Sequence, residues 1–210
     1  MSEHMLEGDP PVRLVLRRSA RARRYSLRVS RLDGRVTLTM PNTASQARAL
    51  EFAYEKADWI RKRLADRPSD VLADIGAVIP VDGRQMRVER ANRNGIDFQA
   101  GCIFVSRRSE SPPATVAGQL RVLARERLIA ASDRYAKRLG CRYSRLTLRD
   151  TRSRWGSCSS AGALMYSWRL ILAPPEVLRY VAAHEVAHLE EMNHGPRFWA
   201  HVESLFPDYR

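Results

Sequence analysis

Apolar residues occupy every second position in three short segments near the N-terminus, and this alternation predicts β-strands. The segments are VRLVLRR at 12–18, RRYSLRVS at 23–30 and GRVTLTMP at 34–41. The dipeptide Asp33-Gly34, at the junction of the last two segments, favours a hairpin turn. A helix is predicted next, because apolar residues then recur at intervals of three and four from a cap at Asn42 or Thr43 to about Arg67.

The middle of the chain predicts short strands again and then a long helix. Strand patterns occupy residues 76–106, with a turn signal at Asp82-Gly83. The segment RRSESPPA at 107–114 is charged and contains serines and two prolines, which indicates a boundary. The apolar spacing beyond this boundary predicts a helix over about 113–139.

The last part of the chain predicts a small sheet with helices. RLTLRD at 145–150 and ALMYSWRLIL at 163–172 have strand patterns, and the polar segment TRSRWGSCSSAG at 151–162 is expected to join them as a loop. Prolines favour helix starts at Pro174-Pro175 and at Pro196.

These elements predict an α+β protein of two domains. Residues 1–110 form the expected N-terminal β-rich basic region, which includes one long helix. Residues 111–210 form the expected C-terminal domain, in which a small sheet accompanies the helices. The sequence shows neither an internal repeat nor a low-complexity tract.

Composition is that of a soluble globular protein. The 210 residues are 44% hydrophobic and 28% charged, and there is no run of eighteen apolar residues to span a membrane. The first twenty residues lack the apolar stretch of a signal peptide. Three widely spaced cysteines, Cys102, Cys141 and Cys158, do not suggest a disulfide framework. We therefore expect a cytoplasmic protein.

Positive charge is concentrated near the N-terminus. The chain has a formal net charge of +13, and residues 11–35 contain nine arginines but only one acidic residue, Asp33. Such a surface can attract nucleic acid or acidic partners, and the candidate nucleic-acid contacts are Arg17, Arg18, Arg23 and Arg24. The alternative is an ordinary solvated face in a chain that uses arginine almost everywhere in place of lysine.

The segment VAAHEVAHLEEMNHGPRFW at 181–199 contains three of the five histidines. His184 and His188 are four residues apart, so on a helix they project from one face, one turn apart. Glu185 lies beside them. The HExxH pattern supplies two metal ligands and a general base in zinc peptidases. The alternative is a core helix with two hydrogen-bonded histidines.

Zinc in a catalytic site takes a third protein ligand and keeps one position open. On a continuing helix His194 would lie about 80° away from the ligand face and roughly 9 Å beyond His188. The chain must therefore turn back after Glu191, and we expect Asn193 and Gly195 to allow this turn. His194 is the predicted third ligand, and His201 and Glu203 are the alternatives.

These residues, together with SRWGSC at 153–158 and FWAHVESLFPDY at 198–209, resemble the YgjP-like metallopeptidase family, which is related to the SprT-like and WLM zinc peptidases. The resemblance extends over nearly the whole chain and includes RRSARARRYSLRVS at 17–30 and AYEKADWIRKRL at 53–64. It implies a zincin-like C-terminal domain that binds Zn²⁺, with His184 and His188 as helix ligands, Glu185 as catalytic base and His194 as downstream ligand.

Metzincins have the same spacing from the first to the third histidine. This chain, however, has Glu191 where metzincins place the glycine of their turn, and no methionine-turn segment is evident downstream. We therefore predict a different turn, close to Asn193 and Gly195, and a protein that is not a metzincin.

The predicted function is that of a zinc-dependent metallopeptidase that hydrolyses peptide bonds with metal-activated water and Glu185 as general base. The strand that precedes the active helix is expected to bind an extended peptide by strand addition; its candidate residues are Tyr166, Ser167, Trp168 and Arg169. Tyr166, Arg169 and Tyr209 are candidates to stabilise the oxyanion. The alternatives are a nucleic-acid-associated protease that uses the basic N-terminal region, and a non-catalytic metal-binding module.

Overall fold

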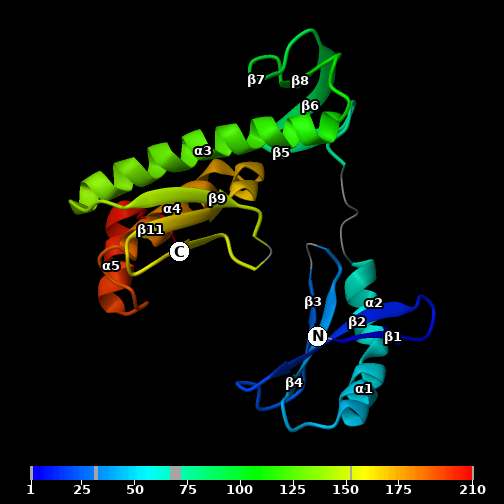
Figure 1. Cartoon of the computed structure of the whole chain (residues 1–210). Helices are drawn as coiled ribbons and strands as arrows, with labels where there is room; N and C mark the ends of the chain where they lie inside the picture. The colour runs from blue at the N-terminus through cyan, green and yellow to red at the C-terminus, as the bar shows by residue number, and fades with distance from the viewer. Residues whose placement is uncertain (1, 31–32, 67–71, 152, 210) are drawn as a thin grey trace. The chain divides into compact units, whose positions relative to one another are not determined.

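The structure is a computed structural model that describes residues 2–30, 33–66, 72–151 and 153–209. The chain forms two compact units, Met1–Asp70 and Val71–Arg210. The described residues form three small mixed sheets and five α-helices, which confirms the α+β class (Figure 1). No helix in the described ranges is both long and apolar enough to cross a membrane.

The first unit is a four-stranded sheet with two helices. Its elements are β1 (Ser2–Leu6), β2 (Val12–Ser19), β3 (Ser26–Val29), β4 (Val36–Pro41), α1 (Gln46–Glu55) and α2 (Ala57–Ala65). The strand order is β1-β2-β4-β3; β2 and β4 are parallel, and both outer pairs are antiparallel. The predicted strands are therefore confirmed, and β1 is an additional strand that the sequence patterns did not predict.

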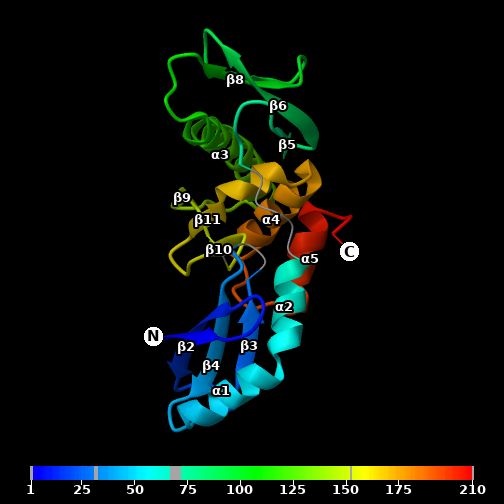
Figure 2. The same cartoon turned by 90° about the vertical axis from the view of Figure 1, so that its right-hand side faces the viewer.

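Alternation along β2 and β4 builds the core of the first unit. Leu14 and Leu16 of β2 and Leu38 of β4 are buried, and they pack with Ala53 and Ile60 of α1 and α2, which cover this face of the sheet (Figure 2). Side chains at the alternate positions point to the opposite face of the sheet.

The single helix predicted up to about Arg67 is wrong in two respects. It consists of two helices that meet at Lys56, whose φ of −101° and ψ of 11° leave the helical region. Its N-cap residue is Ser45 rather than Asn42 or Thr43. The predicted end at Arg67 lies outside the described residues.

The second unit begins with another four-stranded sheet and a long helix. Its first elements are β5 (Val78–Val81), β6 (Arg84–Ala91), β7 (Gly95–Asp97), β8 (Cys102–Ser106) and α3 (Pro112–Leu139). The strand order is β5-β6-β8-β7, with a central parallel pair and antiparallel outer pairs. This topology is the same as that of β1–β4 followed by α1. The structure therefore contains a repeat that the sequence does not reveal.

The long helix α3 joins this sheet to the rest of the second unit. Val105 of β8, Leu120 and Leu128 of α3 and Val186 farther along the chain belong to one continuous core. The predicted domain boundary at 110/111 therefore falls inside the second unit, between β8 and α3. The charged segment at 107–111 is a connection between packed elements, because the strands before it and the helix after it bury apolar side chains against each other.

The remaining elements form a third sheet and two helices. They are β9 (Arg145–Arg149), β10 (Gly156–Cys158), β11 (Ala163–Ser167), the 3₁₀-helix η1 (Trp168–Leu172), α4 (Pro175–Ala187) and α5 (Pro196–Leu205). The strand order is β10-β11-β9, so β11 is central, antiparallel to β10 and parallel to β9.

Two sequence-based predictions for this sheet are wrong. The segment at 151–162 is not only a loop, because residues 156–158 within it form the edge strand β10. The segment at 163–172 is not one strand, because residues 168–172 coil into η1. The helix starts predicted at Pro174-Pro175 and Pro196 are confirmed. A zincin-like identity for this part of the chain stays a prediction.

Candidate metal centre

Helix α4 places His184 and His188 next to each other. Pro175 occupies its first turn, and the small residues Ala182, Ala183 and Ala187 are fully buried, which lets the helix approach its neighbours closely. His184 lies in the last turn and His188 is the C-cap residue, still with right-handed helical dihedrals. Their ring centroids are 5.1 Å apart.

The chain turns back directly after α4, earlier than predicted. The backbone N–H groups of Glu190 and Glu191 both donate to the carbonyl of Ala187, which tightens the end of the helix. No residue from 188 to 195, all of which the structure describes, has a positive φ, and Gly195 itself is extended. The expectation that a left-handed Asn193 or Gly195 makes this turn is therefore wrong.

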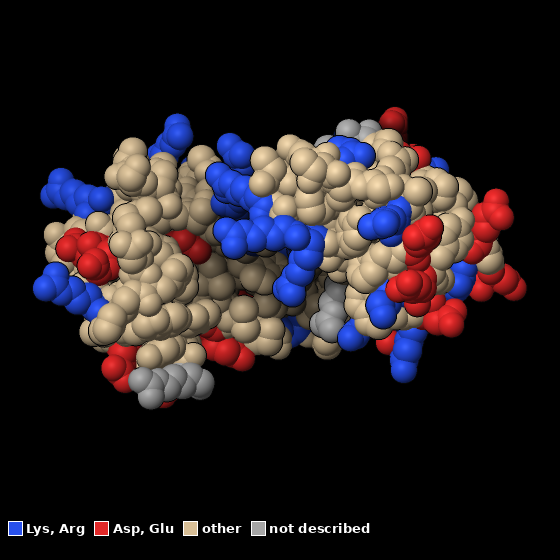
Figure 3. All heavy atoms as spheres, turned by 90° about the horizontal axis from the view of Figure 1, so that it is seen from below, with Lys and Arg blue, Asp and Glu red and all other residues tan. Residues whose placement is uncertain are grey.

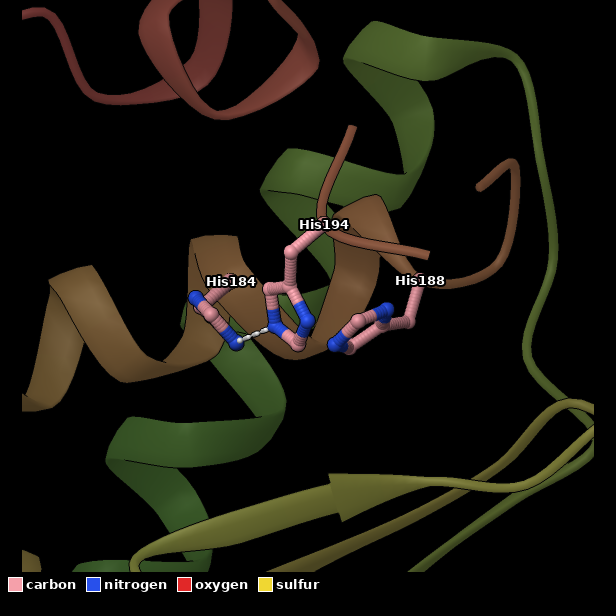
Figure 4. Close-up of side chains that lie close together, drawn as sticks. All are labelled: His184, His188 and His194. Atoms are coloured by element: carbon pink, nitrogen blue, oxygen red, sulfur yellow. Dashed lines mark hydrogen bonds between the residues drawn. The ribbon is translucent and has the colours of Figure 1, made fainter. Parts of the chain in front are cut away.

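The turn brings His194 to the two helix histidines, as Figure 4 shows. The Nε2 atoms of His184 and His194 are 3.1 Å apart, and one ring nitrogen from each of the three histidines lies within 4.8 Å of the others. The predicted grouping of His184, His188 and His194 is thus present in the folded chain. His201 and Glu203 do not belong to any such group of metal-ligand side chains in the described part of the chain.

The protonation pattern of the cluster fits a cation. His188 Nδ1 lies 3.0 Å from the carbonyl oxygen of Glu191, which can only accept, so Nδ1 carries the proton and Nε2 keeps its lone pair. At most one proton can lie between the facing Nε2 atoms of His184 and His194. Two nitrogens bound to one tetrahedral zinc ion at about 2.0–2.1 Å would be about 3.3 Å apart, close to the 3.1 Å observed.

The ionisation of the two helix histidines also fits a cation. His184 Nδ1, which is not the nitrogen that faces His194, is buried and has no hydrogen-bond partner among the described residues. Burial, together with the smaller effects of the neighbouring His188 and His194, lowers the pKa of His184 to about 4, and burial also lowers the pKa of His188. Both rings are therefore neutral near pH 7, which is the state that binds a metal ion.

Aromatic side chains surround the histidines. The ring of Phe198, fully buried at the start of α5, lies 4.5 to 4.9 Å from all three imidazole rings. Trp199 lies about 6 Å from His184 and His194 and stacks on Tyr209. This shell restricts the imidazole rings to a few orientations. Tyr209, a predicted oxyanion candidate, thus lies near the cluster as part of its aromatic wall.

Glu185 is buried beside the cluster, with 6% of its surface exposed. Burial raises the pKa of its carboxyl group to about 7, although the positive charge of Arg154 and a hydrogen bond from the backbone N–H of Cys158 oppose the shift. The carboxyl group fits here because residue 156 is a glycine. A Cβ atom at Gly156 would lie only 2.6 Å from Glu185 Cγ and Oε1.

Gly156 and Cys158 are therefore site residues that were not predicted from the sequence. Their backbone groups point away from β11. The flanking interstrand hydrogen bonds run from the Ser167 N–H to the Trp155 carbonyl and from the Ser159 N–H to the Ala163 carbonyl, and groups that face the partner strand recur at every second residue. One outward group, the Cys158 N–H, reaches Glu185. The available signal was the glycine within the SRWGSC motif, which marked a close backbone approach as well as a turn.

The predicted substrate strand does not have a free edge. Tyr166 and Ser167 belong to β11, which is hydrogen-bonded on both sides, and both side chains are fully buried. Trp168 and Arg169 lie in η1. Addition of a peptide strand to these four residues is therefore excluded, because the ladder partners β9 and β10 already occupy both edges of β11.

Two of the oxyanion candidates have other partners. The buried hydroxyl of Tyr166 is 3.1 Å from that of Ser132 in α3. Arg169 donates two hydrogen bonds to Asp150, at 2.7 and 3.2 Å, and its guanidinium lies 5.0 Å from the centre of the Trp168 ring. The contacts of both residues hold the sheet, α3 and η1 together, and they do not involve the histidine cluster.

The predicted nucleic-acid contacts lie in the first unit. Arg17, Arg23 and Arg24 are exposed at the end of β2 and in the connection to β3. Arg18 is exposed too, but its guanidinium donates to the carbonyls of Asn42 and Ala44 at 2.7 and 2.9 Å and thereby anchors the segment before α1. Figure 3 shows Lys and Arg side chains (blue) and Asp and Glu side chains (red) on one face of the molecule.

A cluster of three histidines with a buried glutamate beside it is the type of site that metal-dependent hydrolases use. The chain belongs to the YgjP-like metallopeptidase family, because the model of the YgjP-like metallopeptidase domain matches residues 23–210. This match confirms the family resemblance of the sequence. Comparison with the curated proteins and with the solved structures gave no match.

Proposed function

We propose that the chain is a zinc-dependent peptidase in which His184, His188 and His194 hold the ion and Glu185 is the general base. The observation that carries the proposal is the convergence of three imidazole nitrogens within 4.8 Å, next to a glutamate buried on the same helix. When bound, a zinc ion supplies Lewis-acid polarisation of a carbonyl group and acidification of water.

The residues of the chain prepare the reaction in three ways. The carbonyl of Glu191 accepts the Nδ1 proton of His188 and so directs the free Nε2 toward the cluster. The aromatic ring of Phe198 holds the imidazoles and keeps water from their far side. A carboxylate oxygen of Glu185 takes a proton from the attacking water and passes it to the leaving amine, and a pKa of about 7 suits both transfers.

The substrate, on this proposal, lies along the outer edge of β10. The outward backbone groups of Gly156 and Cys158 are beside Glu185, and among the described strands β10 has a ladder partner only on its β11 side. An extended peptide can add to such an edge through its outward main-chain groups other than the Cys158 N–H, which already donates to Glu185. This arrangement would place a peptide carbonyl beside Glu185. On this proposal β10 takes the place of β11 as the strand that binds the substrate.

Replacing Glu185 by Gln tests the proposal. Glu185→Gln is nearly isosteric and keeps an oxygen that can accept the Cys158 N–H, so the variant should bind one zinc ion per chain with unchanged affinity. Hydrolysis of a fluorogenic peptide mixture should fall by at least about a hundredfold, because general-base catalysis contributes about 10²–10⁴-fold. Zinc content and peptide cleavage would be measured on the same samples.

A chelator-treated native sample and its zinc-reconstituted form are the matched controls. Recovery of cleavage with zinc supports the peptidase. Two results would contradict it: full activity of Glu185→Gln, or a native protein that binds zinc and needs it for folding but cleaves no peptide. The second result would favour the alternative of a non-catalytic metal-binding module.

A second candidate function is attachment to nucleic acid through the first unit. It is favoured by the exposure of Arg17, Arg23 and Arg24, whereas Arg18 is engaged with carbonyl groups of its own unit. Neutralising Arg17, Arg23 and Arg24 should weaken binding to duplex DNA and flatten its dependence on salt concentration. If the native protein does not bind DNA at low salt, this candidate fails.

A further inference from the structure

The outer face of the third sheet is hollowed into a groove of about 590 Å³. Its basic and hydroxyl-bearing lining includes Arg145, Arg149, Arg154, Thr147, Ser157 and Ser159, and neither Asp nor Glu lines it. All of the lining residues belong to the second unit and to the described part of the chain. The groove is separate from the histidine cluster.

Strand register explains how these side chains come together. In β9, Arg145, Thr147 and Arg149 alternate with the apolar residues Leu146 and Leu148, which point to the core. Thr147 lies opposite Met165 of β11, and Met165 lies opposite Ser157 of β10. Thr147, Met165 and Ser157 therefore form a row across the outer face of the sheet. Arg145 and Arg149 lie on either side of Thr147 along β9.

The positive charge of the groove is not neutralised within the described ranges. No ion pair involves Arg145, Arg149 or Arg154 there, whereas the nearby Arg169 is paired with Asp150 at 2.7 Å. Three unpaired guanidinium groups on one concave face repel one another and attract anionic groups. Guanidinium groups bind carboxylates through paired hydrogen bonds, and the hydroxyl groups of the groove add further donors.

The groove adjoins the catalytic base. Cys158 lines the groove, and its backbone N–H donates to the Glu185 carboxylate. Arg154, which also lines the groove, is close enough for its charge to act on Glu185. A chain that passes along the outer edge of β10 therefore lies next to both the base and the groove.

We propose that this groove is a specificity site that binds acidic side chains of the peptide substrate on one side of the scissile bond. The proposal rests on the proposed peptidase function. Arg145 and Arg149 are four residues apart on a strand, which is about 13 Å. Acidic residues at positions i and i+4 of an extended peptide have the same separation. Because β11 lies between β10 and β9, the part of the peptide beyond the scissile bond must leave the edge of β10 and lie over the outer face of the sheet along β9. In that position each carboxylate can meet one guanidinium group.

A binding measurement tests the groove without requiring hydrolysis. The zinc-loaded full-length Glu185→Gln protein is titrated against two fluorescein-labelled peptides that differ only in Glu or Gln at positions i and i+4. The Glu peptide should bind about tenfold more tightly, because two exposed ion pairs contribute about three- to fivefold each. The preference should shrink at high salt.

Substitution of the arginines then assigns the preference to the groove. In the same background, Arg145→Gln with Arg149→Gln should bring the two affinities to within about twofold of each other. The matched control is Arg142→Gln, which removes an exposed arginine outside the groove lining and should keep the preference. Circular dichroism and zinc content show whether each variant is folded.

Equal binding of the two peptides, or an equal loss in Arg142→Gln, would overturn the proposal. So would tighter binding of a single-stranded oligonucleotide that the double substitution abolishes, because this result assigns the groove to nucleic acid. Cleavage of both peptides by the native enzyme separates the two proposals. No cleavage with a preserved Glu preference rejects only the peptidase, whereas equal kcat/KM values for both peptides reject only the acidic specificity.

Discussion

The sheets β1–β4 and β5–β8 have the same strand order and the same pairing, and each is followed by a helix that packs on it. Matched residues occupy their centres. Leu38 of β4 lies between Leu16 and Leu27, and Ile103 of β8 lies between Val88 and Ile96. Leu38 and Ile103 are both fully buried.

The two sheets differ in the helices that come after them in the chain. In the first unit, α1 and α2 complete a core that belongs to that unit alone. In the second unit, α3 extends beyond the sheet and shares one core with β11, η1 and α4, which contains His184 and is followed directly by its C-cap residue His188. The same architecture therefore forms a core of its own in the first unit, whereas in the second unit it supports the candidate metal centre.

The largest expected effect comes from shortening the two matched core residues. Leu38→Ala and Ile103→Ala should each lower the free energy of unfolding by about 2–5 kcal/mol. Their effects on zinc should differ, because only Ile103 shares a core with α4. Thermal unfolding would be followed with and without zinc. Zinc should raise the midpoint of the transition of the second unit, which Ile103→Ala lowers, and should leave unchanged the midpoint of the first unit, which Leu38→Ala lowers.

The two variants serve as controls for each other, since both remove a fully buried aliphatic side chain from an equivalent strand. An equal zinc-dependent shift in both transitions would contradict this difference between the two units. It would mean that the two units unfold as one cooperative body.

The next effect concerns the elements that have no counterpart in the first unit. Gly156→Ala should reduce peptide hydrolysis at least about tenfold, because its Cβ would displace the Glu185 carboxyl group, and a misplaced catalytic group costs this much or more. The zinc ligands should keep their affinity. Activity and zinc content of the purified variant would be measured together.

Gly118→Ala in α3 is the matched control, because a Cβ at that position meets no atom within 4 Å. It should retain activity and stabilise the helix by up to about 1 kcal/mol. If Gly156→Ala were as active as Gly118→Ala, the close contact between β10 and Glu185 would have no catalytic role.

The smallest effect is a dependence of stability on pH in the second unit. The hydrogen bond from Arg169 lowers the pKa of Asp150, an effect that partial burial opposes. A carboxyl group whose pKa is lower in the folded state stabilises that state above the unfolded pKa, and the contribution disappears as the pH falls through the folded pKa. Because the pair is partly exposed, its contribution should be under about 1 kcal/mol.

Asp150→Asn should therefore lower the stability of the second unit by more at pH 7 than at about pH 2.5, because the contribution of the charge falls as the pH drops below the unfolded pKa of an aspartate toward the lower folded pKa. Chemical unfolding at both pH values would measure the difference. A loss of equal size at the lower pH would show that the aspartate acts through packing or neutral hydrogen bonds instead of charge. The unfolding of the first unit is the internal reference, since Asp150 does not belong to its core.

Local patterns in the sequence were sufficient for many of these features. Alternating apolar residues predicted β2, β4, β6 and β9, and the prolines predicted where α4 and α5 begin. The spacing of His184, Glu185 and His188 identified the helix of the candidate site, because a helix converts a separation of four residues into one face. The return of His194 was expected from the need for a third ligand, although the conformation of the turn was not.

Only the tertiary structure decided the features that depend on residues far apart in the chain. Strand pairing decided that the free edge belongs to β10, because β11 is paired on both sides. The role of Gly156 depends on the side chain of Glu185, which is far away in the sequence. The sequence did not reveal the repeated topology, because many different apolar sequences can form strands that pair in the same order. The arginine groove likewise required the register of three strands. The sequence determined which side chains are available for chemistry, and long-range packing determined their neighbours.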